Sequence, residues 1–291
     1  MNVICTFKDN QQTHGICATL SKLNHTVAIW SPEHKPIFDI FDEVKPDIFF
    51  CHQDFVNPLI DDVLYEYKNI KFVGLSDSKF PLKKQPDLVC LETSTLYDPF
   101  HPLDGYEGER IFYKDYANVA LYNSGTPQKK LETDLLYLSL YKNPRDDVLI
   151  PTLRFLAKQF QLKIFGNHTL PLPEYLGMLP PSDISNAMAS AKVAIDIYDF
   201  NRYDYATNKT CCIVNHTNKE DIWESSNKFN ELADKIQLLL NEENKRKSLI
   251  NKAFNFVKKD QTYFHFCAKI LSVLGFPKEA EKCLEELKEL L

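Results

Sequence analysis

Glycine is scarce in this chain, with 8 in 291 residues, about 3% against roughly 7% in an average protein. The two glycine-rich phosphate loops are absent: neither G-x-G-x-x-G nor G-x-x-x-x-G-K followed by Ser or Thr occurs. Their absence argues against a nicotinamide-dependent dehydrogenase and against a P-loop kinase. With so few glycines, backbone approaches that demand this residue must be few.

Long apolar runs are also missing, because no window reaches 18 uninterrupted apolar residues. The first nine residues lack the basic stretch and apolar core of a signal peptide. The eight cysteines form no C-x-x-C pair and mostly stand inside apolar runs, as buried thiols do. These features predict a cytoplasmic protein without a membrane span.

Motifs for metal binding are absent as well. There is no H-x-x-x-H, no clustered Cys/His spacing and no clear D-x-D, so no metal site is predicted. The 40 acidic residues outnumber the 34 basic ones, for a net charge of −6 and a pI near 5.8. This balance disfavours a uniform nucleic-acid surface or a polybasic membrane anchor, although a local basic groove is compatible with it.

What the first half of the chain does contain is a regular alternation of apolar β-type runs and amphipathic stretches. This alternation is typical of β-α units around a parallel sheet. The expected strands are Asn2–Phe7, Thr26–Trp30, Asp47–Cys51, Lys71–Leu75 and Leu88–Leu91, and the expected helices are His14–Leu23, Pro36–Val44 and Pro58–Tyr67. From residue 99 to 125 the pattern loosens, with a short strand expected at Val119–Tyr122.

The alternation restarts beyond the breaker-rich segment 124–130, which has the composition of a linker. The expected strands are Leu135–Tyr141, Leu162–Phe165, Val193–Tyr198 and Cys211–Val214; the expected helices are Val148–Phe160, Ser182–Ala191 and a tail from 220 to 291 with breaks near 260 and 275. We therefore predict an α/β protein of two Rossmann-like domains facing a central cleft: 1–125, 126–274, and a closing amphipathic helix 275–291.

Ligands of open α/β sheets bind at the carboxyl ends of the strands, so the polar residues that follow strands are the candidates for chemistry. In the first half these include His52, Asp54 and Asp77, each a candidate to position or deprotonate an acceptor hydroxyl. The alternative is that they cap helices or satisfy loop backbone.

In the second half, Gly166, Asn167 and His168 directly follow an expected strand. Glycine lacks the Cβ that would block a nucleotide from the backbone, and the next two side chains are able to hydrogen-bond a ligand. A plain turn is the alternative reading of Gly166, and capping is the alternative for the two residues after it.

The segment 199–214, DFNRYDYATNKTCCIV, resembles the R-x-F-E-x-x-A-C-G-G run of CgeB-like (spore-maturation protein-like) glycosyltransferases. Tyr203 takes the aromatic position and Asp204 the acidic one, while Asn201 stands in place of the arginine. Lys209 and Thr210 replace the paired glycines, which leaves Lys209 as a candidate to neutralise a diphosphate. Stretches 179–197 and 260–271 are similar to flanking parts of that family, so that the resemblance covers roughly residues 134–274.

The resemblance implies a fold of the GT-B type and transfer of a sugar from a nucleotide-diphosphate donor, a UDP-sugar, with no further cofactor. In this reading Asp204 holds the ribose, and the second domain binds the donor. The acceptor, a glycan, a protein or a hydroxymethylated DNA base, is held by the first domain. The alternative is a catalytically silent protein of the same fold that binds a nucleotide or a partner.

Overall fold

The computed structural model describes residues 1–6, 11–76, 85–92, 106, 108–113, 116–140, 146–197, 201–215 and 222–291. The chain divides into two compact units. Unit 1 comprises Met1–Lys114 and Phe264–Glu286, and unit 2 comprises Asp115–Tyr263 and Leu287–Leu291.

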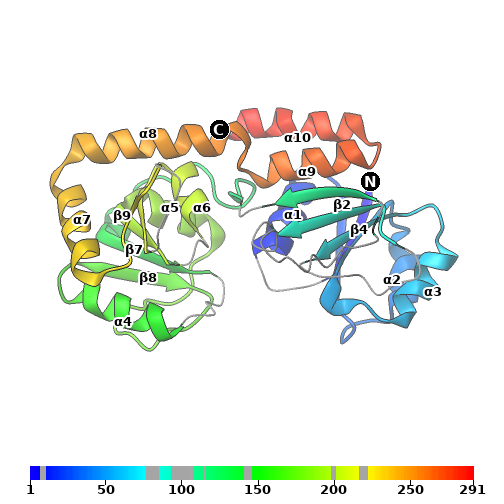
Figure 1. The fold of residues 1–291 in the computed structure, drawn as a ribbon, viewed down its shortest axis with the longest axis horizontal. Coiled ribbons are helices and arrows are strands. Elements are labelled where there is room, and N and C mark those ends of the chain that lie inside the picture. The colour runs from blue at the N-terminus through cyan, green and yellow to red at the C-terminus, as the bar shows by residue number, and fades with distance from the viewer. Residues whose placement is uncertain are drawn as a thin grey trace. The chain divides into compact units, whose positions relative to one another are not determined.

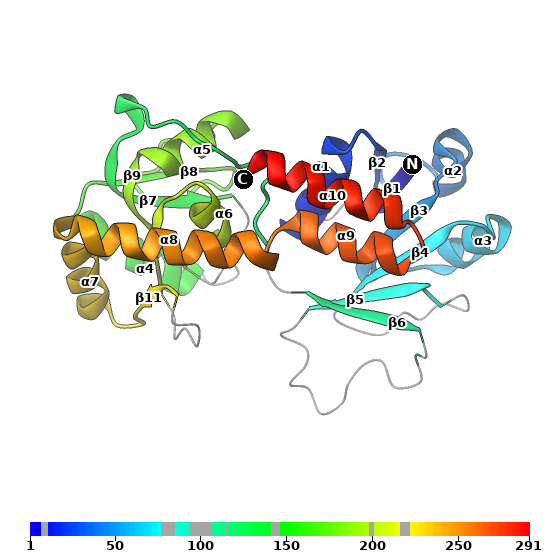
Figure 2. The same ribbon diagram turned by 90° about the horizontal axis from the view of Figure 1, so that it is seen from above.

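Unit 1 contains a parallel sheet of six strands in the order β2-β1-β3-β4-β5-β6. Figure 1 labels β2 and β4 of this sheet, and Figure 2 labels all six strands. The strands are β1 (Asn2–Thr6), β2 (Thr26–Trp30), β3 (Ile48–His52), β4 (Lys71–Ser76), β5 (Leu88–Glu92) and β6 (Glu109–Tyr113). Strand β3 reads Ile-Phe-Phe-Cys-His and is buried along its whole length, as expected for a central strand of a parallel sheet covered on both faces.

Three helices connect the early strands of unit 1: α1 (Gln11–Lys22), α2 (Ile37–Val44) and α3 (Pro58–Glu66). Helix α3 begins where the sequence indicates, because Asn57 accepts a hydrogen bond from Leu59 N–H and Pro58 occupies the first turn. One apolar cluster packs α2 and α3 against the sheet, with Phe49 of β3 touching the rings of Phe41 and Phe72.

The last two helices, α9 (Tyr263–Val273) and α10 (Pro277–Leu290), lie beside α1 in both views (Figures 1 and 2). Cys267 on α9 is buried, which raises the pKa of its thiol well above the usual value, and it interacts electrostatically with Cys17 of α1 and Cys90 of β5. Most of α9 and α10 therefore belongs to unit 1 by its contacts. The domain boundaries predicted from the sequence, at residues 125 and 274, do not include this return of the chain to unit 1. They stay a prediction.

His25, between α1 and β2, is expected to make the stability of unit 1 depend on pH. Its Nε2 lies 3.4 Å from Glu279 Oε2 on α10, yet burial outweighs that carboxylate and lowers the pKa of His25. The unfolded chain therefore takes up a proton at this histidine before the folded chain does as the pH falls through about 6.5, so folding loses stability below that pH.

We expect the wild-type Tm to fall more steeply between pH 8 and pH 5 than that of His25→Gln, because glutamine does not titrate. Glu279, whose pKa is held below its usual value chiefly by Lys282, stays ionised through this range. Thermal denaturation at half-unit pH steps measures the difference. Parallel Tm profiles for the two proteins would show that His25 does not contribute to the acid sensitivity.

Unit 2 contains a second parallel sheet, of five strands in the order β11-β10-β9-β7-β8. The strands are β7 (Thr133–Ser139), β8 (Leu162–Gly166), β9 (Ala191–Asp196), β10 (Cys211–Val214) and the short β11 (Glu224–Ser225). Beyond edge strand β8, Leu176 N–H donates to Ile164 O and Gly166 N–H donates to Gly177 O. Residues 174–177 therefore cover part of that edge.

The helices of unit 2 are α4 (Asp146–Ala157), α5 (Pro181–Ser190), α6 (Arg202–Thr207), α7 (Phe229–Asn241) and α8 (Glu243–Asp260). Helices α4 and α7 pack leucine and isoleucine side chains on one face of the sheet, where the apolar core of this unit lies. Helix α6 is buried at every position and contacts both α8 and β10. The side chains of α6 therefore pack within unit 2.

The β-α alternation expected from the sequence is confirmed in both halves. Two differences stand out. Residues 119–122 form a turn rather than a strand, with Leu121 and Tyr122 N–H groups donating to Asn118 O, and β6 was not expected. Within the described ranges, no helix combines the length and apolar character needed to span a bilayer.

Candidate functional site

The carboxyl end of β7 in unit 2 is flanked by two polar residues that the sequence places after neighbouring strands. Asn201 Nδ2 donates to Leu138 O at 2.9 Å, and the N–H of His168 donates to Ser139 O at 3.1 Å. Successive carbonyls of a strand point to opposite neighbours. Asn201 therefore lies on the β9 side of the end of β7, and His168 lies on the β8 side.

Asp196, the last residue of β9, connects the next strand to this edge. Its Oδ1 accepts a hydrogen bond from Asn201 N–H at 3.2 Å, and its carbonyl accepts one from Asn215 N–H at 2.9 Å. Asn215 follows β10 and its Nδ2 reaches Thr152 Oγ1 of α4 at 3.4 Å. The carboxyl ends of β7, β8, β9 and β10 thus carry a connected set of polar groups.

Among the residues that the structure describes, His168 Nε2, Asn201 Oδ1 and Asn215 Oδ1 have no hydrogen-bond partner although they are buried. Asn201 and Asn215 are only 2% and 6% exposed. A buried polar atom left unpaired costs about 1–3 kcal/mol, so three at one edge of a sheet indicate a place where a polar ligand or water binds. We name His168, Asn201 and Asn215 the carboxyl-edge triad.

Gly166, predicted to let a nucleotide approach the backbone, serves a contact within the protein. It has φ +150°, and a Cβ added there would lie 2.2 Å from Ser139 O. The close approach that requires glycine is therefore to strand β7. Asn167, next in the chain, is exposed, whereas His168 is partly buried; the structure places all three at the carboxyl edge, and their contacts to a donor stay a prediction.

Tyr203 is buried in an aromatic cluster with Trp223. The two rings meet edge to face at 5.5 Å, and the Arg202 guanidinium lies over both, 4.7 Å from the Tyr203 ring and 5.2 Å from the Trp223 ring. Arg202 also donates to the Tyr203 hydroxyl at 2.9 Å. Sequence reasoning did not single out Arg202 or Trp223, because the cluster joins residues twenty positions apart with no shared motif.

Asp204, predicted to hold a ribose, is completely buried. Its Oδ1 accepts a hydrogen bond from Asn118 N–H at 2.6 Å, which fastens the turn at 118–122 to helix α6. The neighbouring Tyr205 hydroxyl, also buried, accepts from Leu138 N–H at 3.0 Å. In this arrangement Asp204 serves the protein interior, and its contact to a ribose stays a prediction.

Lys209 lies at the other edge of the sheet from the carboxyl-edge triad. It lies two positions before β10, and Cys211, the first residue of β10, pairs with Val193 near the start of β9. The ends of a seven-residue strand such as β7 are roughly 20 Å apart. A shared diphosphate site would require Lys209 to lie close to Gly166 and His168. The structure places Lys209 at the opposite edge of the sheet from these two residues.

The Lys209 ammonium instead lies 5.4 Å from the centre of the Phe254 ring. The two side chains line a cavity of about 260 Å³ with Ser124, Gly125, Thr207, Asn208, Leu290 and Leu291. Asn208, the neighbour of Lys209, has both ends of its side-chain amide engaged: Nδ2 donates to Asp204 O and Tyr122 O, and Oδ1 accepts from Gly125 N–H.

In unit 1, His52 closes β3 and caps the short turn that follows. Its Nδ1 accepts from Asp54 N–H at 3.2 Å and lies 3.4 Å from Asp54 Oδ2, and its own N–H donates to Thr6 Oγ1 at 2.8 Å. The side chain of Asp54 is about half exposed. The capping alternative thus describes what His52 does here, the base role of both residues stays a prediction, and Asp77 lies outside the described residues.

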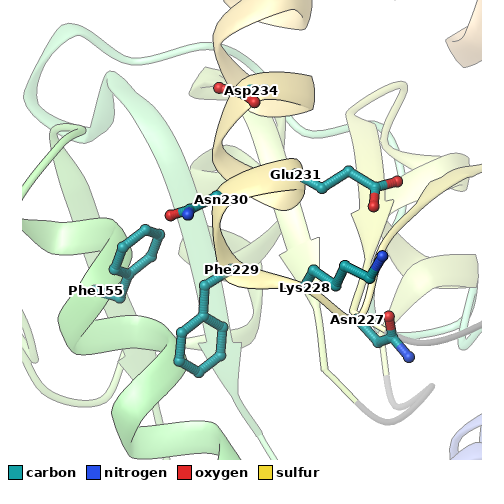
Figure 3. A pocket seen from close by; sticks show the side chains of 7 residues that line it. All are labelled: Phe155, Asn227, Lys228, Phe229, Asn230, Glu231 and Asp234. Atoms are coloured by element: carbon teal, nitrogen blue, oxygen red, sulfur yellow. The ribbon is translucent and has the colours of Figure 1, made fainter.

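A hollow of about 630 Å³ on unit 2 lies at the start of α7 (Figure 3). Phe155 of α4 and Phe229 of α7 stack there with ring centres 5.4 Å apart, beside the charged side chains of Lys228, Glu231 and Asp234. None of the residues predicted from the sequence lines this hollow. Within the described ranges, no group of three His, Cys, Asp or Glu side chains is arranged to hold a metal ion, and metal independence stays a prediction.

Two parallel sheets, each covered by helices and each followed by polar groups at its carboxyl edge, give this chain the α/β fold of GT-B glycosyltransferases. No protein-family model and no curated protein sequence matches the chain. The CgeB-like resemblance therefore stays a prediction.

Solved structures of this fold match almost the whole chain. Alr3699/HepE from Anabaena, solved with UDP-glucose, matches with a TM-score of 0.60 at 10% identity over 98% of this chain and 99% of its own. WaaG, a glycosyltransferase involved in lipopolysaccharide biosynthesis, matches with a TM-score of 0.58 at 10% identity, over 94% of this chain and 100% of its own. MnaA from S. aureus, solved with UDP, matches with a TM-score of 0.55 at 11% identity, over 95% of this chain and 98% of its own. At such identities the likeness shows the fold.

Proposed function

We propose that this protein is a glycosyltransferase whose unit 2 binds a nucleotide-diphosphate sugar, a UDP-sugar, and which transfers the sugar to an acceptor hydroxyl. The observation that carries the proposal is the carboxyl-edge triad, with three buried polar atoms that lack partners at the edge where sheets of this kind bind ligands. Similar solved structures hold UDP-glucose or UDP, which supports a uridine nucleotide as the donor.

The acceptor side of the proposal rests on unit 1. Asp54 presents a half-exposed carboxylate at the end of the most apolar strand of that unit, and His52 is held next to it by Thr6. A carboxylate or an imidazole in that position is able to take the proton of an acceptor hydroxyl as the sugar is transferred. Asp77 remains a candidate for the same task. The acceptor is a glycan, a protein or a hydroxymethylated DNA base.

The test measures binding first and transfer second. A nucleotide sugar present at about 100 times its Kd stabilises the folded state by about 2.7 kcal/mol, so its binding raises the Tm. A panel of UDP, GDP and dTDP with their glucose, galactose, mannose and N-acetylglucosamine esters identifies the donor. Release of the nucleoside diphosphate from it, in the presence of acceptor candidates, then measures transfer.

Two variants locate the site. His168→Ala is expected to reduce the Tm increase caused by the donor, since it removes a member of the carboxyl-edge triad. Lys209→Ala, which removes a cation from the opposite edge of the same sheet, is expected to leave that increase unchanged. The reverse pattern would place the donor at the amino edge and overturn this assignment.

The absence of any Tm increase over the whole panel would contradict donor binding. Binding without nucleotide release with any acceptor would favour the catalytically silent alternative. An Asp54→Asn variant with full transfer activity would exclude Asp54 as the base.

A further inference from the structure

The side-chain amide of Asn201 has a fixed orientation. The residue immediately precedes α6, its N–H donates to Asp196 Oδ1, and its Nδ2 donates to Leu138 O. Because a carbonyl oxygen only accepts hydrogen bonds, the nitrogen of the amide must face Leu138. The amide oxygen, Oδ1, therefore points away from β7, and protein contacts hold it in place.

This oxygen is a buried acceptor that no group in the described part of the chain hydrogen-bonds. It requires a group that donates a hydrogen bond, such as a hydroxyl or an N–H. The oxygens of an ionised diphosphate carry no hydrogen to donate, so they do not satisfy Asn201 Oδ1. The hydroxyl groups of a nucleotide sugar do, and a sugar ring offers several of them.

His168, on the other side of the end of β7, has the complementary capacity. Its backbone is held by Ser139 O, and its unpaired Nε2 donates a hydrogen bond when it carries a proton. A phosphate or carbonyl oxygen of the same ligand is a suitable acceptor there. The two sides of β7 therefore offer different hydrogen-bonding groups, an acceptor at Asn201 Oδ1 and, when protonated, a donor at His168 Nε2.

We propose that Asn201 Oδ1 accepts a hydrogen bond from a hydroxyl of the transferred sugar and thereby contributes to the choice of donor sugar. This inference rests on the proposed function, because it concerns the same donor. A ribose hydroxyl has the same chemistry as a hexose hydroxyl, so the test must separate the two sources.

The affinities of UDP-glucose and UDP, measured by isothermal titration for wild type and Asn201→Ala, make that separation. Loss of one hydrogen bond to a sugar hydroxyl is expected to weaken UDP-glucose binding about tenfold and to leave UDP binding unchanged. If the panel above selects another donor, that nucleotide sugar and its own nucleoside diphosphate replace this pair.

The matched control is Asn208→Ala, at the other end of α6. Asn208 is buried like Asn201, but both ends of its amide are engaged within the protein. Its loss is expected to lower the Tm without changing the ratio of the two affinities. If Asn201→Ala does not fold, Asn201→Ser, a smaller polar replacement, takes its place.

The wild-type protein supplies a test that needs no variant. Among the 2-, 3-, 4- and 6-deoxy analogues of UDP-glucose, one is expected to bind about tenfold more weakly to wild type. That same analogue should lose nothing further with Asn201→Ala, because the partner of Oδ1 is already missing.

Three results would overturn the inference. If Asn201→Ala weakens the binding of UDP and of UDP-glucose equally, Asn201 contacts the ribose or only supports the protein structure. An unchanged affinity ratio for Asn201→Ala would remove it from sugar recognition. If the wild-type protein binds no nucleotide sugar, the proposed function itself is wrong. Binding to the wild-type protein is therefore measured before any variant is made.

Discussion

Replacing Gly166 with alanine is expected to destabilise the protein by roughly 3–5 kcal/mol. The new Cβ would lie 2.2 Å from Ser139 O and 2.8 Å from Ser139 Cα, and the backbone φ of +150° is one that residues with a Cβ avoid. Since Ser139 is a backbone neighbour in the sheet, it moves only if β7 and β8 separate. A loss of this size lowers the Tm of a unit of about 150 residues by roughly 10 °C.

Gly177→Ala is the matched control. Gly177 also has a positive φ, +97°, but nothing lies within 4 Å of the position a Cβ would take. Its replacement is expected to cost only the backbone strain, about 1–2 kcal/mol. Thermal or urea denaturation of both variants measures the difference; equal losses would mean that the contact with Ser139 does not decide the need for glycine at 166.

The contact of Gly166 also shows the limit of reasoning from residue type. The sequence predicts that the backbone at residue 166 approaches a nucleotide closely, and this contact stays a prediction; the close approach that the structure shows is to Ser139. The partner, however, is the strand β7, which lies 27 residues earlier in the chain. Which neighbour requires the glycine depends on the strand order, and the order is set by packing between distant segments.

Most of the fold could be predicted because its signal is local. Runs such as Ile48–His52, with only apolar residues before a final histidine, predict buried parallel strands. Strand β6 escaped notice because it begins with Glu109 and Arg110 and lies at the edge of the sheet. The return of α9 to unit 1 could not be predicted, since an apolar helix face does not by itself indicate which unit it packs against.

The candidate site was predicted in part, and for a physical reason. Residues that follow strands, such as Asn167 and His168, could be assigned to the carboxyl edge because strand direction alone determines their position. Lys209 could not, because it was assigned from its place in a motif, and helix α6 carries the chain back across the sheet before that residue. Burial of Asp204 depends on the turn at Asn118, 86 positions away.

Replacing Asp204 with alanine is expected to cost about 2–4 kcal/mol of folding free energy. The change removes the acceptor for Asn118 N–H, leaves that group buried without a partner, and opens a cavity under α6. Thermal denaturation should show a Tm lower by roughly 5–10 °C.

Asp204→Asn separates this role from the ribose contact that the sequence predicts. The asparagine oxygen is able to accept from Asn118 N–H, so most of the stability should be retained. If Asp204 acts only within the protein, the affinity for UDP at a temperature where both proteins are folded should be the same for Asp204→Asn and wild type. A variant with wild-type stability and at least tenfold weaker UDP binding would instead require that the carboxylate becomes accessible and holds the ribose.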